Sequence, residues 1–213
     1  MERVVAARTR QFDKSLALDL AERAAVTALF AWFAADLLRS AVTGIWFNWL
    51  LLFSEAVIVV FILLRRRTAA VSLRPPEWAL AAAGSWGPLL VRPGGPGPLA
   101  EPALLAAMML AGVLLQVSAK LVLARSFGLI PANRGVKREG PYRLLRHPMY
   151  AGYVLTHIGF LLAYPTLWNA AVYGTCLCLQ VMRIQAEERL LAEDAEYRAF
   201  QSAVRWRLLP GVF

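Results

Sequence analysis

The fold class follows from one stretch, Tyr150–Met182, which reads YAGYVLTHIGFLLAYPTLWNAAVYGTCLCLQVM. Its first apolar run, Tyr150–Tyr164, ends at Pro165, and the second begins at once at Thr166. Because a helix usually ends at or before the residue that precedes a proline, this pattern predicts two membrane helices joined by a tight turn. The stretch therefore predicts a helical hairpin that turns at one face of a bilayer.

The rest of the chain extends this hairpin into a larger helical bundle. Of its 213 residues, 59% are hydrophobic and 17% are charged, whereas soluble domains contain about 45–50% and about 25%. Four more apolar runs precede the hairpin, at Ala24–Leu38, Trp46–Leu64, Trp78–Val91 and Pro102–Leu123. Gly84 and Gly87-Pro88 interrupt the third of them. We predict an all-α, polytopic membrane bundle with about six crossings, or five if the interrupted run does not fully span.

The placement of Lys and Arg predicts how this bundle is oriented. Basic residues gather in the N-terminal segment, in Arg65–Arg74, in Arg125–Arg146 and in the C-terminal tail. Basic loops stay on the cytosolic side, and an even number of crossings places all four segments there. We therefore expect six crossings, with both termini cytosolic, in a bacterial inner membrane or an equivalent bilayer. The net charge of +9 favours anionic lipid headgroups as partners over nucleic acid, for which no recognition motif is present.

We divide the chain into two regions. Residues 1–120 hold the N-terminal membrane helices with an interfacial lead-in, and residues 121–213 hold the motifs with which chemistry is associated. The loop at 125–152 is rich in donors, turn residues and aromatics. His147-Pro148 marks a turn, and Pro148 suits the first position of a helix.

The start of this helix has the features of a ligand site. Its unpaired amides, together with the side chains of Arg146 and His147, could hold a carboxylate. Tyr142 and Tyr150 could line an adenine-sized pocket, and Gly152 permits close approach of a ligand or of a neighbouring helix. The alternative is purely interfacial, with the basic residues at headgroups and the tyrosines in an aromatic belt.

A second cluster lies where the sixth apolar run ends. Arg183, Glu187 and Glu188 occupy positions i, i+4 and i+5 of a helix that we expect to continue through Arg198. Arg183 and Glu187 share one helical face, which is also typical of an ion pair on a solvated helix. Ionisable groups at the end of an apolar span that face the bundle interior usually serve function, and this favours Arg183 as a functional residue.

No metal site is predicted. His147 and His157 are ten residues apart, or about 15 Å along a helix, and no cysteine or carboxylate triplet has ligand spacing. For His157, packing or an interhelical hydrogen bond is favoured over catalysis. Asp36 and Glu55 are either interhelical partners or interface residues.

Two motifs carry a family resemblance. GPYRLLRHPMYAG at Gly140–Gly152 is followed by RIQAEERLL at Arg183–Leu191. At this separation the pair resembles the isoprenylcysteine carboxyl methyltransferase family and, more broadly, is similar to membrane methyltransferases that include phospholipid N-methyltransferases. The resemblance covers Leu121 to Pro210.

The resemblance implies that S-adenosylmethionine binds at the cytosolic end of the bundle. It implies Arg183 and Glu187 as catalytic residues, with Arg183 suited to holding an acceptor carboxylate. The residues implied in cofactor binding are Tyr142, His147, Pro148, Tyr150, Gly152, Glu187 and Glu188.

The expected activity is carboxyl O-methylation of an isoprenylcysteine-like substrate, so the partners are a lipophilic small molecule or prenylated acceptor and membrane lipid. A phospholipid or lipophilic amine N-methyltransferase is the first alternative. A non-catalytic scaffold or small transporter is the second, and an NADPH-dependent sterol reductase with a similar C-terminal region is the third. The sequence carries no signal for the oligomeric state.

Overall fold

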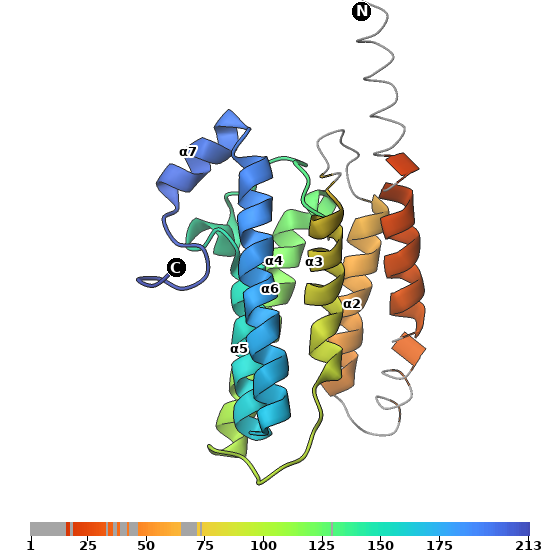
Figure 1. Cartoon of the computed structure of the whole chain (residues 1–213), viewed down its shortest axis with the longest axis vertical. Coiled ribbons are helices and arrows are strands. Elements are labelled where there is room, and N and C mark those ends of the chain that lie inside the picture. The colour runs from red at the N-terminus through yellow and green to blue at the C-terminus, as the bar shows by residue number, and fades with distance from the viewer. Residues whose placement is uncertain are drawn as a thin grey trace, which may run out of the picture. The chain divides into compact units, whose positions relative to one another are not determined.

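Figure 1 shows the computed structural model of the chain, which describes residues 16–17, 19–32, 34–35, 38, 42, 47–64, 72, 74–128 and 130–213. The regular elements in these ranges are helices, which confirms the all-α prediction for the described part. Residues 19–32 are helical. The helices that follow are α2 (Phe47–Leu64), α3 (Pro75–Trp86), η1 (Gly87–Leu90), α4 (Pro102–Leu123), η2 (Ala124–Ser126), η3 (Gly140–Arg143), α5 (Pro148–Ala163), α6 (Leu167–Leu191) and α7 (Ala195–Ala203).

One helix among the described residues is long and apolar enough to cross a membrane by length and composition, and it extends from Pro102 to Ser126. The apolar α5 has 16 residues, which extend about 24 Å at about 1.5 Å per residue. The third apolar run is interrupted at Gly87-Pro88 as predicted, because α3 ends at Trp86 and Gly87 begins the tighter turn η1. The interruption predicted at Gly84 is wrong, since this glycine lies inside α3. The count of six crossings stays a prediction.

The chain forms two compact units, Met1–Leu73 with Leu123–Gly135, and Arg74–Val122 with Val136–Phe213. In the first unit, the acids of the N-terminal helical residues engage the segment at 123–135. Asp19 Oδ1 lies 4.0 Å from Arg134 Nη2, and the Ile130 amide donates to Glu22 Oε1 at 3.2 Å. Asp36 lies outside the described residues, and so does the side chain of Glu55. The division of the chain at residue 120 stays a prediction.

The second unit contains the predicted helical hairpin, which is confirmed as a pair of helices; that the hairpin crosses a bilayer stays a prediction. In it α5 ends before Tyr164, α6 begins after Thr166, and the two helices pack against each other. Thr166 caps α6, because its hydroxyl accepts a hydrogen bond from the Asn169 amide at 3.1 Å, and such a cap satisfies one of the free amides of a helix start. α3 packs on the same α6. Proline begins both α4 and α5, as predicted.

α4 and α5 approach each other closely through glycines. A Cβ atom added at Gly152 would lie 2.7 Å from the Gly112 carbonyl oxygen, and one at Gly112 would lie 2.8 Å from the Gly152 carbonyl oxygen. One turn away, Gln116 Nε2 donates to Thr156 Oγ1 at 3.1 Å. Small residues with a polar pair beside them are typical of packed membrane helices. Gly152 therefore serves the approach of a neighbouring helix, and its role at a cofactor stays a prediction.

The continuous helix expected through Arg198 is wrong. α6 ends at Leu191, a turn follows, and α7 begins at Ala195. Asp194 caps the new helix, since its carboxylate accepts a hydrogen bond from the Glu196 amide at 2.8 Å. An aspartate in a charged run has the same appearance in sequence whether it caps a helix or lies on its surface.

Candidate active site

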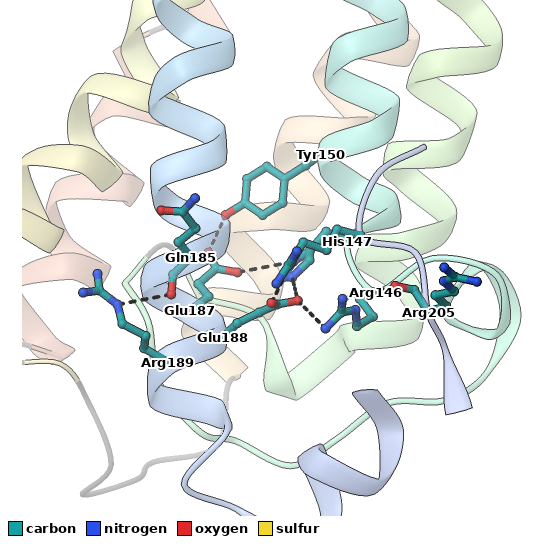
Figure 2. A network of polar contacts seen from close by, with 9 residues as sticks. Arg146, His147, Tyr150, Gln185, Glu187, Glu188, Arg189 and Arg205 are labelled. Atoms are coloured by element: carbon teal, nitrogen blue, oxygen red, sulfur yellow. Dashed lines mark hydrogen bonds and ion pairs between the residues drawn. The ribbon is translucent and has the colours of Figure 1, made fainter. Parts of the chain in front are cut away.

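The two motifs meet at one end of the second unit (Figure 2). His147 occupies the N-cap position of α5, and Glu187 and Glu188 lie on α6 beyond its apolar part. His147 Nε2 lies 3.2 Å from Glu188 Oε1, and Nδ1 lies 3.8 Å from Glu187 Oε2. The imidazole is thus held between two carboxylates that come from a distant part of the sequence.

Glu188 is surrounded by positive charge. Arg146 Nη1 lies 3.0 Å from its Oε1, and Arg207 Nε lies 2.8 Å from its Oε2. Burial by itself raises the pKa of Glu188, but hydrogen bonds from His147 and Arg207, with the charges of His147 and Arg146, hold that pKa below its ordinary value. Glu188 therefore stays ionised and is a poor base.

Glu187 has a different environment. It accepts a hydrogen bond from the Tyr150 hydroxyl, and 20% of its side chain is exposed. Figure 2 shows the Tyr150 ring lying beside α6 and directed at Glu187. Its partners are a neutral phenol and a histidine rather than two guanidinium groups. Of the two acids, Glu187 is the more exposed and has no guanidinium partner in Figure 2.

Arg183 faces the interior of the bundle. It is 6% exposed, which contradicts the interpretation of a solvated helix face. Its guanidinium lies 5.3 Å from the centre of the Tyr150 ring, and Nη1 donates to Ser85 Oγ of α3 at 3.4 Å. A Cβ atom at Gly84 would lie 3.1 Å from Arg183 Cδ, so this glycine leaves the space that the arginine occupies.

The remaining predicted residues lie around this cluster. Tyr142 in η3 is buried, and its pKa is raised by burial first and by the charge of Glu187 second, so the phenol stays neutral. Pro148 is buried in the first turn of α5. Arg143 is exposed, as the headgroup interpretation predicts, whereas Arg146 belongs to the cluster.

The sequence reasoning missed the C-terminal segment. The Arg146 amide donates to the Trp206 carbonyl at 2.8 Å, and the His147 amide donates to the Arg207 carbonyl at 2.9 Å. The helix start was predicted to offer unpaired amides to a ligand, but the amide of His147 is already bonded to the Arg207 carbonyl. Arg207 itself reaches back 19 positions to Glu188. In the sequence Arg207 appears only as one basic residue of the tail, and the basic tail predicted the membrane orientation of the chain rather than a role in the site.

Buried polar residues inside the helices were also missed. Lys120 of α4 is 0% exposed, and its Nζ lies 6.0 Å from the Tyr153 ring centre. Gln180 is buried on α6, and its Oε1 has no hydrogen-bond partner among the described residues. His157 stacks on Tyr173 of α6 with ring centres 4.3 Å apart, which agrees with the predicted packing role. The signal that could have identified Lys120 and Gln180 is that each is an isolated polar residue within an apolar run.

Comparisons with known proteins agree with the motifs. Residues 102–195, which include both motifs, match the model of the phospholipid methyltransferase family. No curated protein matches the chain. Among solved structures it is similar to the eukaryotic intramembrane Ras methyltransferase, isoprenylcysteine carboxyl methyltransferase, at 16% identity, a TM-score of 0.47 and 96% coverage of each chain. Residues 102–195 thus carry the pattern of the phospholipid methyltransferase family, which confirms the resemblance of this chain to the membrane methyltransferases.

Proposed function

We propose that this protein is an S-adenosylmethionine-dependent methyltransferase that acts on a lipophilic acceptor at the cytosolic membrane face. One observation carries the proposal: both motifs converge on one cluster, in which His147 and Glu188 are buried and Glu187 is partly exposed. Charged groups at the end of apolar helices are costly to bury, so a cluster that is kept there usually serves function. The match of residues 102–195 to the phospholipid methyltransferase family supports methyl transfer as that function.

The cluster and the residues around it have the chemical groups that the cofactor needs. Tyr142 and Tyr150 supply aromatic faces for adenine, and the carboxylate of Glu187 suits an ammonium or ribose hydroxyl. Two buried donors support the fit, since the Tyr197 hydroxyl and Arg146 Nε have no hydrogen-bond partner among the described residues. Burial, and then the charge of Glu188, raise the pKa of Tyr197, so its hydroxyl remains a neutral donor.

The cofactor supplies an activated methyl group, so the protein's task is alignment and the exclusion of water. We propose a carboxylate of an isoprenylcysteine-like molecule as the acceptor. The buried guanidinium of Arg183 supports this choice, because it lies beside Tyr150 and suits planar recognition of a carboxylate. Too strong a pairing would reduce the nucleophilicity of the oxygen, which makes Arg183 a group that orients the acceptor.

A lipophilic amine is the second candidate acceptor. The observation that favours it is Glu187, whose partly exposed carboxylate has fewer cationic partners than Glu188. A protonated amine must lose a proton before methyl transfer, and Glu187 is placed to accept one. Which acceptor is used decides whether the product is an ester or an amine.

The test uses the full chain in lipid nanodiscs. Calorimetry with S-adenosylmethionine and with its demethylated product measures cofactor binding, and absence of binding of both would overturn the proposal. Transfer of a labelled methyl group is then measured with two acceptors, a prenylated cysteine with a free carboxylate and phosphatidylethanolamine. A base-labile product supports the ester, and a base-stable product supports the amine.

A further inference from the structure

The carboxylate of Glu188 contacts two segments that lie far apart in the sequence, one at the start of α5 and the other at the C-terminus. Its Oε1 contacts Arg146 and His147, which precede α5 or begin it, at 3.0 and 3.2 Å. Its Oε2 contacts Arg207 of the C-terminal segment at 2.8 Å. One oxygen is thus used for the segment that carries His147, and the other for the tail.

Consecutive backbone hydrogen bonds join the tail to this segment, from Arg146 to Trp206 and from His147 to Arg207. Besides the amide bonds from Arg146 and His147, Arg146 Nη2 donates to the Arg205 carbonyl at 3.2 Å. Beyond this pairing the tail folds on itself, because the amides of Arg207, Leu208 and Leu209 donate to the Phe213 carbonyl. The guanidinium of Arg207 also lies 4.9 Å from the Phe213 ring centre. Contacts within the C-terminal segment therefore fix the position of Arg207 independently of its ion pair with Glu188.

We propose that Arg207 is a positioning residue of the site: it holds Glu188 so that Glu188 orients His147 and leaves Glu187 as the carboxylate that meets cofactor or acceptor. The inference rests on the proposed function. A guanidinium is always charged and presents donors in a fixed fork, so it can fix a carboxylate oxygen in place. His147 would then be oriented through its hydrogen bond to the other oxygen, as a carboxylate orients a histidine in many sites.

Other groups around Glu188 do not replace Arg207. Arg146 and His147 both contact Oε1 of Glu188. Tyr197 of α7 lies close enough that the charge of Glu188 raises its pKa. Glu187 is the neighbour of Glu188 on α6. Without Arg207, Oε2 loses its cationic partner, while Arg146 remains 3.0 Å from Oε1. The carboxylate can then rotate about its terminal bond, and the partnership with His147 weakens.

The first measurement is nuclear magnetic resonance of the protein labelled at histidine. The chain contains two histidines, so His147 reports on the site and His157, inside the bundle, is an internal control. In Arg207→Met we expect the ring-nitrogen signals of His147 to shift or broaden, and those of His157 to stay unchanged. Arg207→Lys keeps the charge and is expected to recover part of the native signal. This measurement needs neither cofactor nor acceptor.

The second measurement is cofactor affinity by calorimetry as a function of pH. Loss of one charged hydrogen bond is expected to weaken binding by about tenfold in Arg207→Met. The acid side of the affinity profile should move to higher pH, because Glu188 loses a hydrogen bond that lowers its pKa. In the Glu188→Gln background, Arg207→Met should have no further effect, since the interaction that it removes is already gone.

Arg189→Met is the matched control, because it removes an exposed positive charge that is bonded only to the Gln185 carbonyl of its own helix among the described residues. It should behave as the wild type. Native His147 signals in Arg207→Met would overturn the proposal, and so would equal changes at both histidines, which indicate a general role in folding. If the wild type binds no cofactor, the proposed function fails, and the His147 signals still decide whether Arg207 positions Glu188.

Discussion

His147 Nε2 lies 3.2 Å from Glu188 Oε1, although 41 positions separate the two residues. The contact exists because His147 begins α5, while Glu188 lies near the end of α6, which returns antiparallel to α5 after the hairpin turn. Both ends therefore lie on the same side of the hairpin. The apolar parts of two helices thus determine where two polar residues meet.

Removal of the groups that are proposed to bind the cofactor should weaken cofactor binding. For Glu187→Ala and for His147→Ala we expect a loss of about tenfold in affinity for S-adenosylmethionine, from one charged hydrogen bond each. Calorimetry measures the change, with the exposed Glu193→Ala as the control of equal charge. Unchanged affinity in both variants would remove these residues from the cofactor site.

Arg183→Ala should act on the acceptor instead. Its guanidinium lies on the Tyr150 ring and is proposed to orient the acceptor carboxylate. We expect cofactor affinity to stay within about twofold of wild type, while kcat/KM for a prenylated cysteine falls by about tenfold or more. Equal losses of cofactor binding and turnover would contradict the assignment.

Glu188 should make stability dependent on pH. Its pKa in the folded protein lies below the ordinary value of 4.5, so its contribution is fully present above that pH and is lost as pH falls through the folded-state pKa. The wild type should therefore unfold more readily on acidification below 4.5, and Glu188→Gln should lack this part of the dependence. Denaturant unfolding at several pH values measures it.

Glu188→Gln should also lower stability at neutral pH. It leaves Arg146, whose side chain is 9% exposed, without its charge partner. We expect a cost of about 3 kcal/mol, the low end for a broken buried pair, because Arg207 is partly exposed to solvent. Glu187→Gln keeps an acceptor for Tyr150 and should cost less than about 1 kcal/mol. A similar cost for both variants would mean that the two acids have equivalent surroundings.

The glycine contact between α4 and α5 should tolerate no side chain. Gly152→Ala places a methyl group 2.7 Å from the Gly112 carbonyl oxygen, and we expect it to cost about 1–3 kcal/mol through overpacking. Gly174→Ala on α6 is the control, because no described atom outside its own helix surroundings lies within 4 Å of its added Cβ. It should be neutral or stabilising by about 0.5–1 kcal/mol. Thermal unfolding in one detergent compares the two.

The sequence by itself determined the helical class, the hairpin and the chemical character of the site. Pro148 and Pro165 mark where helices begin and end, because proline lacks the amide that a helix interior needs. The types and spacing of the residues in the two motifs carried the resemblance, which the match over residues 102–195 confirms. These properties are local, or depend on patterns along the chain, and so can be recognised without coordinates.

Only the tertiary structure decided the different surroundings of Glu187 and Glu188. As neighbours in sequence they appear equivalent, but on a helix they point about 100° apart, so one meets Tyr150 and the other meets Arg146 and Arg207. The break at Asp194 and the reach of Arg207 to Glu188 depend on how the tail folds back after α6. Such contacts join residues with no periodic relationship in the sequence, and only packing in three dimensions selects them.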